Sequence, residues 1–293
     1  MISMTLNIED LQLAARADES FDDLIDRKQY NSGPLVALNG LRLRTGDNEP
    51  VRVRIAGKTP GDGVEERNLK MLFHKAGFEK FGYSPTSDGP AVTAVRRPPY
   101  TVPYEYGLFL KELISEDEIE RGHEFARKVY YYKDFNYDYD VARQFDPNAD
   151  VFAVFNSSDE ILALGRSVIR LPGYNCPFMH ATMEDGSHYT IPGRFVRVCE
   201  VMGLYREGRE GIIAFKKLME SLTQYAYYIG KVDSIWTTYD ELDGYTGTYY
   251  KRKLLMENTG VRLIYRDFGG LWNLIFTDRI EELKEVYDNM FVR

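Results

Sequence analysis

The chain has 293 residues, of which 44% are hydrophobic and 28% charged, a composition that is typical of a globular protein and excludes a mainly disordered chain. A net charge of -8 disfavours a protein that binds nucleic acid over its whole surface. Two cysteines cannot form a disulfide framework, four histidines lack metal-ligand spacing, and no apolar stretch is long enough to span a bilayer. Because the N-terminus also lacks a signal-peptide pattern, we expect a cytoplasmic protein with no bound metal.

The first predicted elements are strands and a short helix. Apolar and polar residues alternate over 35–38 and 51–55, which is the pattern of half-buried strands. A short helix is predicted over about 65–80, inside a stretch that is otherwise rich in turn-forming residues.

A proline-rich stretch that ends near Pro103 indicates a domain boundary or hinge. Proline and glycine interrupt regular structure, and such segments commonly connect domains. We therefore expect an N-terminal extension of unknown role over residues 1–104 and a second domain over residues 105–293.

The second domain is predicted to begin with a capped helix. Ser115 followed by Glu118 is typical of a helix N-terminus, and the helix is predicted over 116–130. The remaining elements are predicted in the order strands 151–155 and 161–169 as a hairpin, strand 195–204, loop 205–211, helix 211–229, strand 232–239, helix 245–257, strands 261–265 and 271–276, and helix 279–289. This mixture predicts an α/β or α+β fold.

The loop at residues 205–211, which leads from a strand into a helix, is a candidate anion site. Backbone N–H groups at the start of a helix lack partners within it, and together with the helix dipole they bind phosphate groups. Glycine lets a ligand approach the backbone, and arginine adds charge-assisted hydrogen bonds. The candidate ligand-binding residues are Leu204, Arg206, Gly208, Arg209, Glu210 and Gly211. The alternative is an ordinary solvated connection.

Several stretches together resemble a known family. They are residues 126–130, Asp150 at the start of a strand, residues 164–172 at the end of the hairpin, and residues 199–204. These stretches resemble the GCN5-related N-acetyltransferase (GNAT) fold, and within it the branch of N-acyl amino acid synthases and acyl-homoserine lactone synthases. The resemblance implies an acyltransferase domain whose mixed sheet is splayed at its centre and flanked by helices.

Two positions differ from the patterns of this family. Arg206 and Gly211 match the ends of the acetyltransferase cofactor motif, but Arg209 stands where the motif has its middle glycine. Gly203 stands where the synthases carry an arginine that orients the substrate. The likeness therefore implies acyl transfer more firmly than it implies coenzyme A or homoserine-lactone chemistry.

Glu200 is the candidate general base. It lies in an apolar strand, where a carboxylate is costly unless it is paired or hydrated, and where it suits proton abstraction. The resemblance implies that it takes a proton from an attacking amine, whereas the alternative is a structural ion pair with Arg166 or Arg197. The backbone amides of Met202 and Leu204 are candidates to bind the thioester carbonyl and pantetheine, with ordinary sheet pairing as the alternative.

Two further groups of residues are candidates for the site. The resemblance implies that Tyr250 protonates the departing thiolate, although the family's spacing from tyrosine to glycine is not matched before Gly260. Alternate residues of 236–239 could line an acyl pocket. For both groups the alternative is packing in the core.

The implied co-substrates are an acyl-phosphopantetheine thioester, carried by an acyl carrier protein or coenzyme A, and the amine of an amino acid or similar small molecule. The resemblance suggests a long acyl chain. An acidic carrier protein would be attracted by a local basic cluster. The cluster consists of Arg194, Arg197, Arg206, Arg209, Lys216, Lys217, Lys251, Arg252 and Lys253. Scattered solubilising charges are the alternative.

Two other functions stay open. One is an acetyl-CoA-dependent N-acetyltransferase that acts on a small amine or peptide. The other is a non-catalytic module that binds acyl groups or nucleotides and has kept the fold without the chemistry. Chain-length dependence of turnover separates the first from a long-chain acyltransferase, and absence of turnover with any thioester indicates the second.

Overall fold

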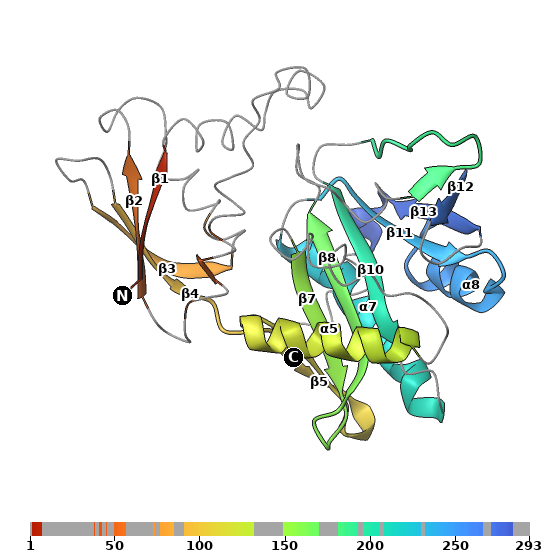
Figure 1. Ribbon diagram of the computed structural model, residues 1–293, viewed down its shortest axis with the longest axis horizontal. Coiled ribbons are helices and arrows are strands. Elements are labelled where there is room, and N and C mark those ends of the chain that lie inside the picture. The colour runs from red at the N-terminus through yellow and green to blue at the C-terminus, as the bar shows by residue number, and fades with distance from the viewer. Residues whose placement is uncertain are drawn as a thin grey trace. The chain divides into compact units, whose positions relative to one another are not determined.

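The computed structural model describes residues 2–7, 38, 41–42, 45, 50–56, 73, 77–84, 91–131, 149–169, 181–192, 196–204, 208–229, 232–265 and 271–283 (Figure 1). The chain divides into two compact units. The first unit comprises Met1–Pro99, Ile114–Asp117 and Leu171–Tyr174, and the second comprises Tyr100–Leu113, Glu118–Arg170 and Asn175–Arg293. The main division therefore falls within the proline-rich stretch.

The first unit contains a four-stranded sheet. In sheet order its strands are β1 (Ile2–Asn7), β2 (Pro50–Ala56), β4 (Ala91–Arg96) and β3 (Phe78–Ser84), with β1 and β2 parallel and the other neighbours antiparallel. In β2 the side chains of Val51 and Val53 are buried while those of Arg52 and Arg54 are exposed. This alternation confirms the strand predicted over 51–55.

Two predictions in this unit differ from the structure. Within the predicted helix 65–80, Phe73 is helical, but residues 78–80 belong to β3, which pairs with β4 in antiparallel register. Most of that predicted helix lies outside the described residues. The predicted strand 35–38 likewise lies mainly outside them, and Leu38 itself is helical. Short apolar runs fit helices and strands equally well, so periodicity alone does not separate the two.

The second unit is built on a nine-stranded mixed sheet. In sheet order its strands are β5 (Thr101–Pro103), β6 (Phe109–Leu113), β7 (Ala149–Phe155), β8 (Ile161–Ile169), β10 (Val196–Leu204), β11 (Ser234–Asp240), β13 (Trp272–Thr277), β12 (Glu257–Tyr265) and β9 (Ala181–Met183). Every neighbouring pair is antiparallel except β10 and β11 at the centre, which are parallel. The predicted α+β class with a mixed sheet is confirmed.

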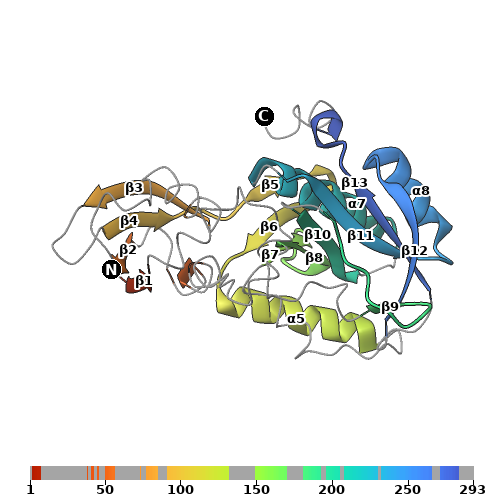
Figure 2. The ribbon, with the colours of Figure 1, turned by 90° about the horizontal axis from the view of Figure 1, so that it is seen from above.

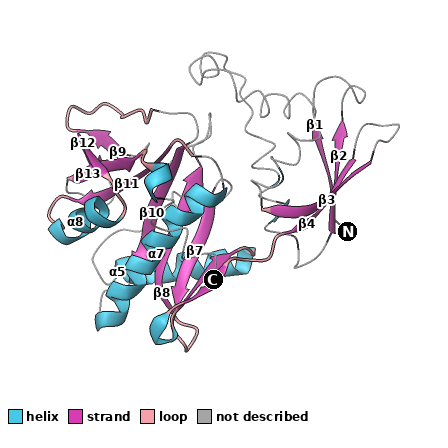
Figure 3. Ribbon diagram, turned by 180° about the vertical axis from the view of Figure 1, so that it is seen from behind, coloured by secondary structure: helices cyan, strands magenta, loops and turns pink. Residues whose placement is uncertain are grey.

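Helices lie on both faces of this sheet (Figures 2 and 3). The helix α5 (Glu116–Tyr131) covers one face, and α7 (Gly208–Ile229) and α8 (Gly244–Lys253) cover the other. The largest buried apolar cluster lies on the α7 face and includes Phe152, Cys199, Leu222 and Tyr250. Within the described residues, no helix has both the length and the apolar character needed to cross a membrane.

Most predicted elements of the second unit are confirmed, with changed ends. The helix α5 begins directly after Ser115, the hairpin is formed by β7 and β8, and α7 begins at Gly208, ahead of the predicted start. The predicted helix 245–257 ends at Lys253, because Glu257 already belongs to β12. Of the predicted helix 279–289, residues 280–283 are helical and the rest lies outside the described residues.

Candidate functional site

The two parallel strands at the centre of the sheet pair over a short length only. Three residues of β10, from Val196 to Val198, pair with three residues of β11, from Ser234 to Trp236. Both strands continue beyond this point, β10 paired with β8 and β11 paired with β13. Along the described residues 199–203, the edge of β10 that faces β11 therefore has no ladder partner. The predicted central splay is thus confirmed, and it begins at Cys199, directly after the last pair.

A β-bulge interrupts β10 in this unpaired half. Val201 pairs with Gly165 and Gly203 with Leu164, so Met202 is the extra residue opposite β8. A bulge leaves the extra residue outside the ladder and re-aims the strand. The sequence singled out Met202 for its amide, and the structure places it at the irregular point of the strand. Its proposed role in binding a carbonyl stays a prediction.

The bulge also changes which face each side chain occupies. Glu200 pairs directly with Arg166 of β8, and its side chain lies on the α5 face. Gly203, three residues later, lies on the same face, because a Cβ built there would be 3.1 Å from the ring of Phe125 and 3.2 Å from the Cα of Ala126 in α5. In a regular strand, residues three apart lie on opposite faces.

Glu200 is bound to a buried arginine. The Nε of Arg166 donates a hydrogen bond of 2.8 Å to Oε2 of Glu200. The Arg166 side chain is 3% exposed and the Glu200 side chain 30% exposed, so the carboxylate is the member of the pair that solvent reaches. The ion pair that the sequence analysis held as the alternative is therefore present, with Arg166 as the partner. The Glu200 carboxylate makes no other hydrogen bond to the part of the chain that the structure describes.

Arg197, the other suggested partner, lies on the opposite face. Its Nη1 donates to Oδ2 of Asp150 at 2.6 Å, and its guanidinium lies 5.7 Å from the ring centre of Tyr225 in α7. Both side chains of this pair are buried. Burial disfavours the charged form of Arg197, but the attraction of Asp150, Tyr225 and Cys199 and the hydrogen bond to Asp150 together outweigh it, so the pKa of Arg197 is raised above its usual value. The prediction that Arg197 belongs to a basic surface is therefore wrong.

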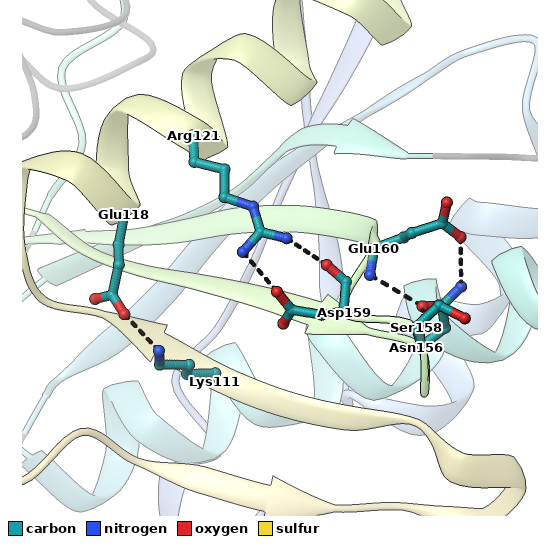
Figure 4. Close-up of polar contacts among 7 residues, drawn as sticks. All are labelled: Lys111, Glu118, Arg121, Asn156, Ser158, Asp159 and Glu160. Atoms are coloured by element: carbon teal, nitrogen blue, oxygen red, sulfur yellow. Dashed lines mark hydrogen bonds and ion pairs between the residues drawn. The ribbon is translucent and has the colours of Figure 1, made fainter.

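Polar contacts hold α5 against the sheet on the face that carries Glu200 (Figure 4). Arg121 of α5 binds Oδ2 of Asp159 at 2.9 Å and lies 5.3 Å from the ring centre of Phe155, at the turn between β7 and β8. Lys111 of β6 binds Glu118 of α5. These contacts join α5 to β6 and to the turn between β7 and β8, at separate points.

The turn that Arg121 contacts is itself well defined. The Oδ1 of Asn156 accepts hydrogen bonds of 3.0 Å from the backbone N–H groups of Ser158 and Glu160, and its Nδ2 donates to Glu160 at 2.9 Å (Figure 4). Asparagine commonly stabilises turns in this way. The turn therefore presents Asp159 to α5 in a fixed position.

The predicted ligand-binding loop is described only in part. Arg206 lies outside the described residues, and Leu204 ends β10 with its side chain packed against the core on the α7 face. Gly208 begins α7 with a φ of +77°, in open space where glycine is the favoured residue. Arg209 and Glu210 are exposed in the first turn of α7, and Gly211 is buried there. Their roles as ligand-binding residues stay predictions.

An exposed tyrosine that the sequence analysis did not single out lies beside Arg209. The guanidinium of Arg209 lies 5.2 Å from the ring centre of Tyr106, in the short 3-10 helix Glu105–Gly107, and Nη2 donates to the tyrosine oxygen at 3.3 Å. Tyr106 has a φ of +63°, which is costly for a residue other than glycine. No local sequence pattern marks Tyr106, because its neighbour in space is a hundred residues away along the chain.

Tyr250 lies in the core on the α7 face. Its ring is 6.2 Å from that of Phe215 in α7 and 6.4 Å from that of Tyr239 in β11, and its side chain is buried. Tyr250 and Glu200 therefore lie on opposite faces of the sheet. The role of Tyr250 as a proton donor stays a prediction.

The residues of β11 suggested for an acyl pocket divide between the two faces. Trp236, Thr237 and Tyr239 are buried and Thr238 is half-buried. Trp236 stacks on Phe276 of β13 at 4.8 Å, whereas Tyr239 joins the cluster with α7 and α8. Packing in the core, the alternative interpretation, accounts for these contacts.

Cys199 and the histidines add no reactive or metal-binding group to the described part of the chain. Burial raises the pKa of the Cys199 thiol to about 12, so it stays protonated at neutral pH. Among the described residues, no group of three or more His, Cys, Asp and Glu side chains is arranged to hold a metal ion.

Comparison with known proteins gives similarity to solved structures alone, since no family model and no curated protein matches the sequence. FeeM, an N-acyl amino acid synthase from uncultured soil microbes, is 13% identical, with 64% of this chain and 94% of FeeM covered and a TM-score of 0.47. The aminoglycoside acetyltransferase AAC(6')-Ib is 14% identical, with 62% and 99% covered and a TM-score of 0.42. A spermidine N-acetyltransferase SpeG chimera from Vibrio cholerae and hSSAT is 8% identical, with 60% and 99% covered and a TM-score of 0.40. Because these identities and TM-scores are low, a function for this chain has to rest on its own strand pairing and side-chain contacts.

Proposed function

We propose that this protein is an N-acyltransferase that moves an acyl group from a phosphopantetheine thioester to the amine of a small molecule, with an amino acid as the favoured acceptor. One observation carries the proposal: β10 and β11 separate after Val198 and Trp236, and Glu200 and the bulge at Met202 follow directly in the unpaired half of β10. An unpaired strand edge supplies hydrogen-bonding groups that a thioester arm needs, and they lie beside a carboxylate.

In this proposal the donor lies along the unpaired edge of β10. Amides near Met202 and Leu204 donate hydrogen bonds to the thioester carbonyl and the pantetheine arm, which stabilises the oxyanion that forms during attack. The first turn of α7, with Gly208, Arg209 and Gly211, binds the phosphate groups of the donor. Arg206 is assigned to the same anion site by the sequence.

The acceptor approaches from the α5 face, where Glu200 lies. The amine nitrogen attacks the thioester carbon, an N–C bond forms, and the C–S bond breaks. Glu200 takes the proton that the amine nitrogen loses, directly or through one water molecule. The departing thiolate takes a proton on the other face, for which Tyr250 is the candidate donor.

The proposal also concerns the molecule that carries the acyl group, either an acyl carrier protein or coenzyme A. The helices α7 and α8 both carry exposed cations and exposed apolar side chains, which suit an acidic acyl carrier protein. They are Arg209 and Ile212 in α7, and Tyr245, Lys251, Arg252 and Lys253 in α8. Lys216 and Lys217 of the predicted basic cluster are half-buried, with Lys216 5.7 Å from the ring centre of Tyr245. A carrier-protein donor would show a steep loss of kcat/KM with added salt, whereas a coenzyme A donor would show a weaker one.

The test is a search for products by intact mass. The protein is incubated with acetyl and long-chain acyl thioesters, each on coenzyme A and on an acyl carrier protein, and with a mixture of amino acids. The expected result is an acceptor whose mass has increased by one acyl group, with release of one free thiol for each product molecule. Absence of turnover with every thioester would favour a non-catalytic binding module.

The variant Glu200→Gln tests the base. Loss of a positioned general base lowers kcat/KM by about 10²–10⁴-fold. The measurement is made at a temperature where circular dichroism shows the variant to be folded. Glu257→Gln, at an exposed position of β12, is the matched control and is expected to leave turnover unchanged. Full activity of Glu200→Gln would remove Glu200 from the proposed reaction.

A further inference from the structure

The pair of Arg166 and Glu200 is oriented, with its cation inside and its anion at the surface. Arg166 lies on β8, the neighbour of β10, at the position directly opposite Glu200. Its side chain is almost fully buried, whereas about a third of the carboxylate side chain is in contact with solvent. An arginine in this position binds the carboxylate from the buried side and leaves the side that faces solvent accessible.

Apolar rows flank the pair on the α5 face of the sheet. The register places Val198 and Val168 on one side and Leu164 and Gly203 on the other, and all four are buried. A low-dielectric surrounding strengthens a charge-assisted hydrogen bond. The carboxylate therefore has one strong partner on this face, in a fixed direction.

We propose that Arg166 is a positioning residue for Glu200, and this inference rests on the proposed acyl transfer. By binding Oε2 through Nε, Arg166 fixes the plane of the carboxylate and leaves Oε1 to accept the proton of the acceptor amine.

The geometry separates this role from that of a purely structural ion pair. Arg197 and Asp150 form such a pair on the other face, and neither side chain is accessible. Arg166 differs because its partner Glu200 is accessible and lies next to the point where β10 and β11 separate. Two buried arginines, 31 positions apart in sequence and on opposite faces of neighbouring strands, therefore provide a matched comparison.

The experiment compares Arg166→Lys and Arg166→Gln with Arg197→Lys in the full-length protein. The kcat and the KM for each substrate are measured on folded protein with the acyl thioester and acceptor found in the product search. Arg166→Gln removes the guanidinium that holds Oε2, so kcat falls while the KM for the thioester stays unchanged. Arg166→Lys keeps a cation but loses the side-on Nε geometry, so kcat falls less than in Arg166→Gln, again without a change in that KM.

The expected loss in kcat for Arg166→Lys is on the order of 10- to 100-fold, the value of one hydrogen bond to a charged group. Arg197→Lys is expected to lower the unfolding temperature and to leave the kcat of the folded protein unchanged. An unchanged kcat in Arg166→Gln, or an equal fall of kcat in folded Arg197→Lys, would overturn the positioning role.

The double variant Arg166→Gln/Glu200→Gln keeps the proposal testable if a single variant is unstable. If Arg166 acts through Glu200, the double variant retains the residual turnover of Glu200→Gln, because the base is already absent. A further large loss would contradict the inference. If Glu200→Gln alone keeps full activity, the proposed reaction fails at the base, and that failure is distinguishable from failure of the positioning role.

Discussion

Each face of the central sheet carries an ion pair between an arginine and a carboxylate, and the two pairs differ in the exposure of the carboxylate. On the α7 face, Arg197 and Asp150 are both buried, with side chains 4% and 7% exposed. On the α5 face, Arg166 is equally buried but Glu200 is open to solvent. A sealed pair can contribute to structure alone, whereas a pair with an open carboxylate keeps a group that can react. Accessibility of the anion, and not the presence of the pair, distinguishes the candidate site.

The largest expected effect on stability comes from breaking the sealed pair. Asp150→Asn leaves the buried guanidinium of Arg197 without a counter-charge and is expected to lower the free energy of unfolding by about 3–5 kcal/mol. Urea unfolding followed by fluorescence measures this. For Glu200→Gln, water at the carboxylate screens the pair, and the expected loss is about 1–2 kcal/mol. Equal losses for the two variants would contradict the distinction between the faces.

The next effect tests how closely α5 approaches the sheet. Gly203→Ala places a methyl group 3.1 Å from Phe125 and 3.2 Å from the backbone of Ala126, and this overpacking is expected to cost about 1–3 kcal/mol. Gly244→Ala, in the first turn of α8, meets nothing within 4 Å and is the matched control. Thermal unfolding compares them. If Gly203→Ala were as stable as the control, α5 would not be held against β10.

The same contact gives a reason for the difference from the synthase pattern. A long side chain at position 203 would have to displace Phe125 of α5. The glycine therefore fits a helix that lies directly on the bulged strand, and an arginine does not. The acceptor, if it binds on this face, is not recognised by a side chain at position 203.

The smallest expected effect concerns Cys199. Its labelling by a thiol reagent reports whether reagents in solution can reach the α7 face of the sheet. Its Sγ lies 3.9 Å from the Ser167 hydroxyl on that face, and burial raises the thiol pKa to about 12. Because the reactive thiolate forms only as the pH approaches that value, a thiol reagent at pH 8 should not label Cys199 in folded protein. The measurement uses a Cys176→Ser background and mass spectrometry, with labelling in urea as the positive control. Rapid labelling of folded protein would show that this face is open.

Much of the second unit could be predicted from local pattern. The hairpin, the strand that carries Glu200 and the long helix after it have strong periodicity, and each is present. Short strands such as β6 and β9 were not predicted, because three to five residues give too little alternation to recognise. Their place in the sheet depends on partners far away in sequence.

The sequence by itself determined that a carboxylate lies in an apolar strand ahead of a glycine- and arginine-containing loop and a long helix. Strand spacing would also have excluded Arg197 as the partner of Glu200, because residues three apart in a regular strand face opposite ways. Only the tertiary structure decided that Glu200 binds Arg166, that Arg197 binds Asp150, and that β11 separates from β10 after three pairs. These features depend on strand register and on a bulge, which are set by side-chain packing between segments distant in the chain and not by any local pattern.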